Sequence, residues 1–145
     1  MKLLIQRVLS AGVSVSGEVI ADIKTGMLVL VGVEKHDTLA HCARAAEKLT
    51  KYRLFSDDNG HMNRSVSDIS GEILLVSQFT LAADTKKGLR PSFSSAMPPG
   101  EALELFNQFV ERVKESGLSV KSGQFGADMQ VCLVNDGPVT FLLEI

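Results

Sequence analysis

Two short runs of the sequence combine residue types that could carry out hydrolysis. The first, Ser77-Gln78-Phe79-Thr80-Leu81, directly follows an apolar stretch typical of a buried strand. It places hydroxyl, amide and aromatic groups where a strand ends and where backbone N–H groups lose their sheet partners. Such N–H groups beside hydroxyls can stabilise an oxyanion. A strand end capped by polar side chains is the structural alternative for the same residues.

The second run, Gly137-Pro138-Val139-Thr140, follows Asn135-Asp136. A bond before proline is the one kind of peptide bond that is cis with appreciable frequency, and glycine allows close approach of the backbone to a ligand. This run could therefore aim backbone carbonyls in an unusual direction. Ordinary turn chemistry is the alternative explanation.

Other kinds of site have little support in the sequence. His36, His41 and His61 lack the spacing of metal ligands, and neither Cys42 nor Cys132 has a CxxC partner, so we expect no metal. His41 and Cys42 are neighbours on an expected helix and point about 100° apart, which argues against a thiol with its base. A GxGxxG or phosphate-loop pattern is missing, and we expect no cofactor.

Composition predicts one domain over residues 1–145, with 45% hydrophobic and 22% charged residues. A chain of this length buries roughly two-thirds of the surface that it exposes when unfolded. The sequence has no run of about 20 apolar residues and no signal-like start, so we expect a cytoplasmic protein that does not contact membranes. Cys42 and Cys132 are expected to be buried, reduced thiols.

The net charge of −2 argues against a general electrostatic attraction to nucleic acid. The net charge does not exclude a local basic patch, whose candidates are Lys86, Lys87 and Arg90. They lie in a long stretch, residues 81–99, that has little periodicity and is rich in Gly, Pro, Ser and Lys. Ordered loops of that length are uncommon unless they serve a site.

Hydrophobic patterning predicts an α+β fold that is richer in strands than in helices. Two amphipathic helices are expected, one after a cap at Asp37 or Thr38 and one from about residue 101 to 116, ending at Gly117. A hairpin is expected to turn at Asn135-Asp136-Gly137-Pro138. Expected strands cover residues 2–9, 13–15, 18–23, 27–33, 72–79, 130–134 and 139–144, with 27–33 buried on both faces.

The chain resembles the D-aminoacyl-tRNA deacylase family, which hydrolyses the ester between a D-amino acid and tRNA. Each of its matching runs is weak alone, but their order and the chain length together make the resemblance specific, and it covers essentially the whole chain. The matching runs are Ile5-Gln6-Arg7-Val8, Ser77-Gln78-Phe79-Thr80-Leu81, Leu89-Arg90-Pro91-Ser92-Phe93 and Gly137-Pro138-Val139-Thr140.

This resemblance implies a compact, barrel-like, β-rich homodimer with active sites at the subunit interface. Gly137-Pro138 would be a cis dipeptide inserted into the pocket of the partner. Its carbonyls would meet the amino group and Cα of the substrate, so that an L side chain collides with backbone. Glycine has no side chain to reject, and glycyl-tRNA is thus a second expected substrate. Arg7 would brace these carbonyls; an exposed strand arginine is the alternative.

The resemblance also suggests Ser77, Gln78, Phe79 and Thr80 as the catalytic group. Thr80 would be the nucleophile or proton handler, yet no histidine or carboxylate in either run offers an activating base. In the alternative mechanism, the terminal 2′-hydroxyl of tRNA activates water and residues 77–80 form the oxyanion hole. Phe79 would stack on the terminal adenine or belong to the core.

Rival functions are a non-enzymatic, dimeric RNA-binding module and a hydrolase of small esters. An RNA-binding module would explain the strand-rich fold and the basic residues Lys86, Lys87 and Arg90. It would not explain a conformationally fixed Gly137-Pro138. Release of amino acid from D-tyrosyl-tRNA, L-tyrosyl-tRNA and a free D-amino acid ester would separate the three functions.

Overall fold

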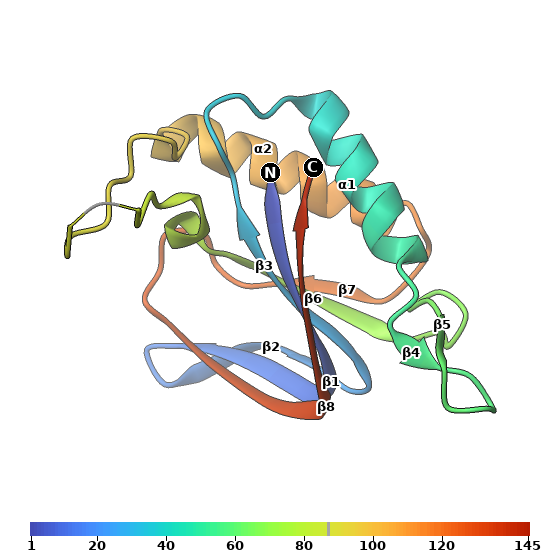
Figure 1. Ribbon diagram of the computed structural model, residues 1–145. Coiled ribbons are helices and arrows are strands. Elements are labelled where there is room, and N and C mark those ends of the chain that lie inside the picture. The colour runs from blue at the N-terminus through green and yellow to red at the C-terminus, as the bar shows by residue number, and fades with distance from the viewer. Residues whose placement is uncertain (87) are drawn as a thin grey trace.

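One long strand, β1 (Lys2–Val15), organises the sheet (Figure 1). The computed structural model describes residues 1–86 and 88–145. Strand order is β2-β1-β3-β6-β7, and β8 pairs with β1 on both sides of a bulge. The sheet curves into a barrel-like shape that is nearly closed, as the family resemblance implies. Its other strands are β2 (Glu18–Ile23), β3 (Gly26–Gly32), β6 (Glu72–Ser77), β7 (Val120–Ser122) and β8 (Met129–Glu144).

Both amphipathic helices are confirmed, and they cover the same face of the sheet (Figure 1). Helix α1 (Leu39–Lys51) connects β3 to the second half of the chain, and α2 (Pro99–Lys114) connects β6 to β7. These crossovers allow β6 to run parallel to β3 and β7 parallel to β6. None of the helices in the described part of the chain has the length and apolar character that crossing a bilayer requires.

The cap of α1 is at Thr38, one of the two expected positions. The Thr38 N–H donates to Nδ1 of His41 over 3.1 Å, which satisfies a donor at the helix start. Helix α2 begins two residues earlier than expected, because Pro99 suits a position where the helix needs no N–H donor. It ends at Lys114, and Gly117 follows with a φ of +78°.

Strand β3 is buried on both faces, which confirms the sequence-based expectation. Met27, Val29 and Val31 pack against the helices, whereas Leu28 belongs to a second apolar cluster on the opposite face of the sheet. Strand β6 alternates in the same way, with Leu75 toward the helices and Leu74 away from them. Continuous apolar runs are thus explained by burial on two sides.

The prediction of a hairpin that turns at residues 135–138 is wrong. Residues 129–144 form a single strand, β8, which pairs antiparallel with β1. Val8 pairs with Asn135 and Gln6 pairs with Thr140, so residues 136–139 stand opposite Arg7 alone. The extra residues therefore form a bulge, because β1 is long enough to pair with both halves of β8. Residues 2–9 and 13–15, expected as two strands, form the single strand β1, because residues 10–15 continue the pairing with β8.

Cys132 is also placed differently from the expectation. Cys42 is buried in α1 as expected, but Cys132 is exposed on β8. Alternation along a strand sends successive side chains to opposite faces, and the outer face of β8 is open to solvent in this chain. A small hairpin of β4 (Phe55–Ser56) and β5 (Met62–Arg64) surrounds the turn at residues 57–60.

Candidate active site

Strand β3 holds the start of the 77–80 run in place. Strand β6 ends at Ser77, and the Gln78 N–H still donates to the Val31 carbonyl over 2.7 Å. A 3₁₀ turn, η1 (Phe79–Ala82), follows directly. Gly32 ends β3 against this turn, where a Cβ would lie 2.7 Å from Cβ of Leu81. A side chain at Gly32 would therefore displace the segment that carries the candidate residues.

Two backbone donors are free at the start of η1. Leu81 and Ala83 donate their N–H groups to the carbonyls of Gln78 and Thr80, over 3.2 and 3.1 Å. The N–H groups of Phe79 and Thr80 have no acceptor among residues 1–86 and 88–145. Helix starts leave such donors unpaired. Two adjacent N–H groups can together hold an oxyanion.

The hydroxyl of Thr80 is exposed and has a polar partner. Nε2 of Gln78 donates to Oγ1 of Thr80 over 2.5 Å. The oxygen of Thr80 thus uses a lone pair as an acceptor, and its hydrogen is left to be donated. Neither cavity beside this run is lined by histidine, aspartate or glutamate. Thr80 itself lines neither cavity, so the preference for a hydrogen-bond donor over a base-activated nucleophile rests on its bond from Gln78.

Two adjoining cavities lie beside the run. One, of about 310 Å³, is lined by Ser77 and Gln78 on one side and by Met129 on the other. The second, of about 470 Å³, is mainly apolar and lies between the start of α2 and Phe93. Phe79, Phe125 and Gly126 line both cavities. Together the cavities offer a polar end beside an apolar one, as ligand sites commonly do.

Phe79 is not a core residue. Its side chain is 59% exposed, and its ring lies 5.0 Å from that of Phe93. Sequence reasoning missed the opposite wall, Phe125 and Gly126. The available signal in the sequence was an aromatic residue followed by glycine in the loop between β7 and β8. In the structure, Gly126 has a φ of +75°, a conformation that favours glycine.

Lys86 and Arg90 of the long loop lie on a projecting segment, which we call the finger. Asp84 and Ser92 exchange backbone hydrogen bonds of 2.8 and 2.9 Å and so close the base of the finger. Lys86 and Arg90 are exposed on it, and it extends away from the sheet between η1 and α2 (Figure 1). Lys87, the third residue expected in this patch, lies outside the described residues.

Arg7 is buried, so the alternative of an exposed strand arginine is wrong. Its side chain bonds the bulge of β8 through Nε, which lies 3.1 Å from the Asp136 carbonyl and 3.0 Å from Oδ2 of Asp136. Its Nη1 donates to the Leu54 carbonyl over 2.8 Å. The carbonyl that Arg7 braces is thus that of Asp136, directly before Gly137.

The Gly137-Pro138 peptide bond is cis, and both residues are exposed. Neither residue lines the two cavities beside residues 77–80. Within one chain, the two runs singled out in the sequence therefore lie apart.

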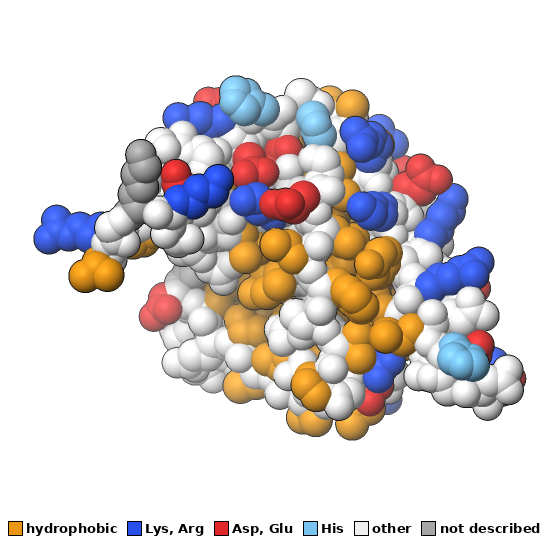
Figure 2. Space-filling model, in the orientation of Figure 1, with side chains coloured by type: hydrophobic (Ala, Val, Ile, Leu, Met, Phe, Trp, Pro, Cys, Tyr) orange, Lys and Arg blue, Asp and Glu red, His pale blue; other side chains and the backbone are white. Residues whose placement is uncertain are grey.

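Exposed apolar side chains gather over β1 and β8 (Figure 2). Leu9, Val134 and Leu142 are each about half exposed, at 52%, 53% and 52%. Leu142 and Val134 lie on either side of the bulge that contains Gly137-Pro138. We call this surface the β1–β8 face. Contiguous exposed apolar patches of this kind mark interaction surfaces.

The chain belongs to the D-Tyr-tRNA(Tyr) deacylase family, whose model matches residues 4–144. It is 59% identical over 145 residues to a D-aminoacyl-tRNA deacylase of Ectopseudomonas mendocina (strain ymp), covering 100% of both chains.

Two solved structures are similar in shape. One is a c-Myc DNA Unwinding Element Binding Protein, with a TM-score of 0.94 and 43% identity, covering 100% of this chain and 99% of that one. The other is described as a probable eukaryotic D-amino acid tRNA deacylase, with a TM-score of 0.87, covering 99% and 98%. Its 17% identity shows a common fold alone.

Proposed function

We propose that this protein hydrolyses the ester bond of D-aminoacyl-tRNA and releases free D-amino acid and tRNA. The observation that carries the proposal is the 59% identity, over all 145 residues, to a D-aminoacyl-tRNA deacylase. Glycyl-tRNA is a second expected substrate because glycine presents no side chain to a chiral filter. Charged tRNA is used in translation, so we expect the protein to act in the cytoplasm.

In the proposed reaction, the N–H groups of Phe79 and Thr80 hold the oxyanion. Water attacks the ester carbonyl carbon, the bond from that carbon to the ribose oxygen breaks, and the ribose oxygen takes up the proton. The Thr80 hydroxyl donates a hydrogen bond to the transition state, because Gln78 already donates to its oxygen. Without a basic side chain along either cavity, the neighbouring ribose hydroxyl of the tRNA is the group that assists water.

Ser77 and Gln78 line the polar end of the site and position the ester. We assign the terminal adenine to the face of Phe79, whose exposed ring can stack on an unpaired base. The apolar cavity between Phe79, Phe93 and the start of α2 is then available beside the reacting end of the tRNA.

Chirality is selected in this proposal by a second copy of the chain. Gly137-Pro138 enters the cavity of the partner, and its carbonyls leave no room for an L side chain. The motif is exposed within its own chain and lies along the β1–β8 face, so dimerisation through that face would cover both. Arg7 holds the carbonyl that precedes the motif and thereby positions it.

Dimerisation can be tested separately from activity. Sedimentation should give about twice the 15.6 kDa of one chain. Leu142→Glu places a charge on the β1–β8 face and should yield inactive monomers. Leu39→Glu is the matched control, because Leu39 is 61% exposed but lies at the start of α1. A wild-type monomer with full activity at micromolar concentration would contradict the proposal.

Activity is tested with matched esters. We expect release of amino acid from D-tyrosyl-tRNA and from glycyl-tRNA, but not from L-tyrosyl-tRNA. Equal hydrolysis of a free D-tyrosine ester would indicate an esterase that does not use RNA. Binding of tRNA without hydrolysis would indicate the alternative, a non-enzymatic RNA-binding module.

Contact with tRNA is proposed for Lys86, Lys87 and Arg90. Neutralising Lys86 and Arg90 should weaken binding to all tRNAs and reduce the salt dependence by about two units of slope. Unchanged affinity across a salt titration would exclude the finger from the RNA surface.

A further inference from the structure

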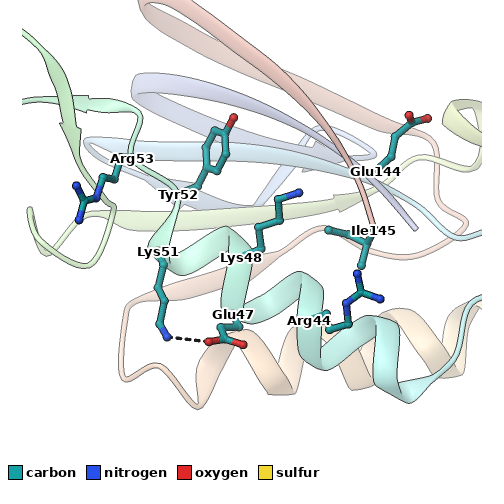
Figure 3. Close-up of a pocket in the computed structure, with 8 residues that line it drawn as sticks. All are labelled: Arg44, Glu47, Lys48, Lys51, Tyr52, Arg53, Glu144 and Ile145. Atoms are coloured by element: carbon teal, nitrogen blue, oxygen red, sulfur yellow. Dashed lines mark hydrogen bonds and ion pairs between the residues drawn. The ribbon is translucent and has the colours of Figure 1, made fainter.

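A second basic surface lies far along the chain from the finger. A groove of about 450 Å³ lies between α1 and the end of β8. Figure 3 shows the residues that line it. Its charged lining consists of four cationic side chains, Arg44, Lys48, Lys51 and Arg53, and two carboxylates, Glu47 and Glu144. We call it the α1 groove. None of the residues used in the proposed reaction lines it.

Helical spacing places the first three cations in a row. Arg44, Lys48 and Lys51 are separated by four and three residues, so they share one face of α1. The row extends about 10 Å along the helix axis. Arg53 continues it just past the end of the helix. Figure 3 shows Arg44 extending toward Ile145, at the end of β8.

Three of these cations have no carboxylate partner among the described residues. Lys51 is paired with Glu47 over 2.8 Å, and Arg53 donates to Oδ1 of Asn63 over 3.0 Å. Arg44 and Lys48 form no ion pair with the described residues. Attraction to the helix dipole accounts for Lys48 and Lys51 in the last turn of α1, but not for Arg44 or Arg53. With Glu47 and Glu144 counted, the side chains of the groove keep an excess of two positive charges, in a chain whose net charge is −2.

The groove is connected to the bulge that carries Gly137-Pro138. Arg7 bonds the carbonyls of both Leu54 and Asp136, and Leu54 directly follows Arg53. On the other side, the ring of Tyr52 packs edge-on against Phe141 of β8, with centroids 5.4 Å apart. The segment that forms one end of the groove is therefore held against the strand that carries the motif.

We propose that the α1 groove binds the phosphate backbone of the tRNA whose 3′ end is being hydrolysed. The identity of the RNA rests on the proposed function. In the proposed dimer, the groove belongs to the subunit that lends Gly137-Pro138 to the active site. One subunit thus supplies the cavity, and its partner supplies both the chiral filter and part of the RNA track.

Phosphate is the ligand that fits this surface best. Exposed Arg and Lys side chains in a row contact successive phosphates without reading bases. Arg44 has the forked guanidinium suited to phosphate oxygens. Binding of this kind is independent of sequence and weakens with salt, which suits an enzyme that must accept several different tRNAs.

The test compares two double variants that each remove one Arg and one Lys. Arg44→Gln/Lys48→Gln removes the two unpaired cations of the groove. Arg112→Gln/Lys114→Gln is the control, since these exposed residues occupy the last turn of α2 and pair with Glu115 and Glu111. Binding of uncharged tRNA is measured from about 50 to 200 mM salt.

We expect the groove variant to bind tRNA about tenfold more weakly at low salt, with a salt slope smaller by about two. The control and the charge-conserving Arg44→Lys/Lys48→Arg variant should bind like the wild type. Circular dichroism and urea unfolding verify that each variant is folded. Equal affinity and slope for the groove variant and the control would overturn the proposal.

Hydrolysis separates this inference from the proposed function. The ratio of kcat/KM for D-tyrosyl-tRNA to that for D-tyrosyl-adenosine should fall about tenfold in the groove variant, because the adenosine ester carries no backbone phosphates. An unchanged ratio would count against the groove. If the wild type hydrolyses neither ester, the proposed function fails, and the binding measurement alone decides the role of the groove.

Discussion

The side chain of Arg7 joins two segments that are distant in the sequence, by donating to the carbonyls of Asp136 and Leu54. It lies on β1 opposite the bulge and is 9% exposed. Buried carbonyls need donors, and a guanidinium can supply two at once in a fixed geometry. Arg7 thereby fixes both the entry to Gly137-Pro138 and the end of the α1 groove.

Arg7→Lys should destabilise the protein and loosen the filter. A lysine retains the charge but cannot reach both carbonyls in the same geometry, so at least one buried acceptor loses its donor, at a cost of about 1–3 kcal/mol. Urea unfolding measures the stability, and hydrolysis of D- and L-tyrosyl-tRNA measures the discrimination, which should fall. Arg64→Lys is the control, since Arg64 pairs with Asp58 at the surface. Unaltered stability and discrimination in Arg7→Lys would refute this role.

Thr80→Ala distinguishes a nucleophile from a hydrogen-bond donor. Loss of one donor to the transition state should lower kcat by roughly 10²–10³, whereas loss of an essential nucleophile costs several orders of magnitude more. We expect the smaller loss, because the Thr80 oxygen accepts from Gln78 and no histidine, aspartate or glutamate lines either cavity beside the run. Thr80→Ser retains the hydroxyl and should keep most of the activity. Isolation of an aminoacyl ester on Thr80 would contradict this expectation.

Gly137→Ala should lower activity on every D-aminoacyl-tRNA by a similar factor. An added Cβ would lie 2.8 Å from Cγ2 of Val139 and 3.2 Å from Nη2 of Arg7, and the φ of +124° is unfavourable for alanine. Gly60→Ala is the control: its φ is +80°, and a Cβ there meets nothing within 4 Å. Steady-state kinetics on several D-aminoacyl-tRNAs measure the effect. Losses that depend strongly on the side chain of the substrate would argue against a backbone filter.

Cys42 should make stability fall at alkaline pH. Burial, and secondarily the negative charge of Asp37, raise the pKa of this thiol to about 11 from 9.0. The unfolded chain therefore ionises first, so the contribution of the thiol is complete below pH 9 and is lost as the pH rises toward 11. Urea midpoints at pH 8 and pH 10.5 should decrease more in the wild type than in Cys42→Ala. The same pH slope in both proteins would exclude this role.

Much of the local structure was determined by the sequence alone. The apolar residues of α1 and α2 recur at helical spacing, and the continuous run in β3 signals burial on two faces, because both patterns arise from neighbours in the chain. The cap at Thr38 and the turn at residues 57–60 follow from local hydrogen bonding. The chemical runs at residues 77–81 and 137–140 were likewise visible without a structure.

The tertiary structure decided where those runs lie and what surrounds them. Residues 135–138 suit either a hairpin turn or a bulge, and the bulge forms because β1 is long enough to pair with both halves of β8. Arg7 is buried only because Leu54 and Asp136 converge on it. The Phe125 wall and the α1 groove similarly join segments far apart in the chain. Local propensities cannot specify such long-range contacts, since these contacts depend on which distant surfaces pack together.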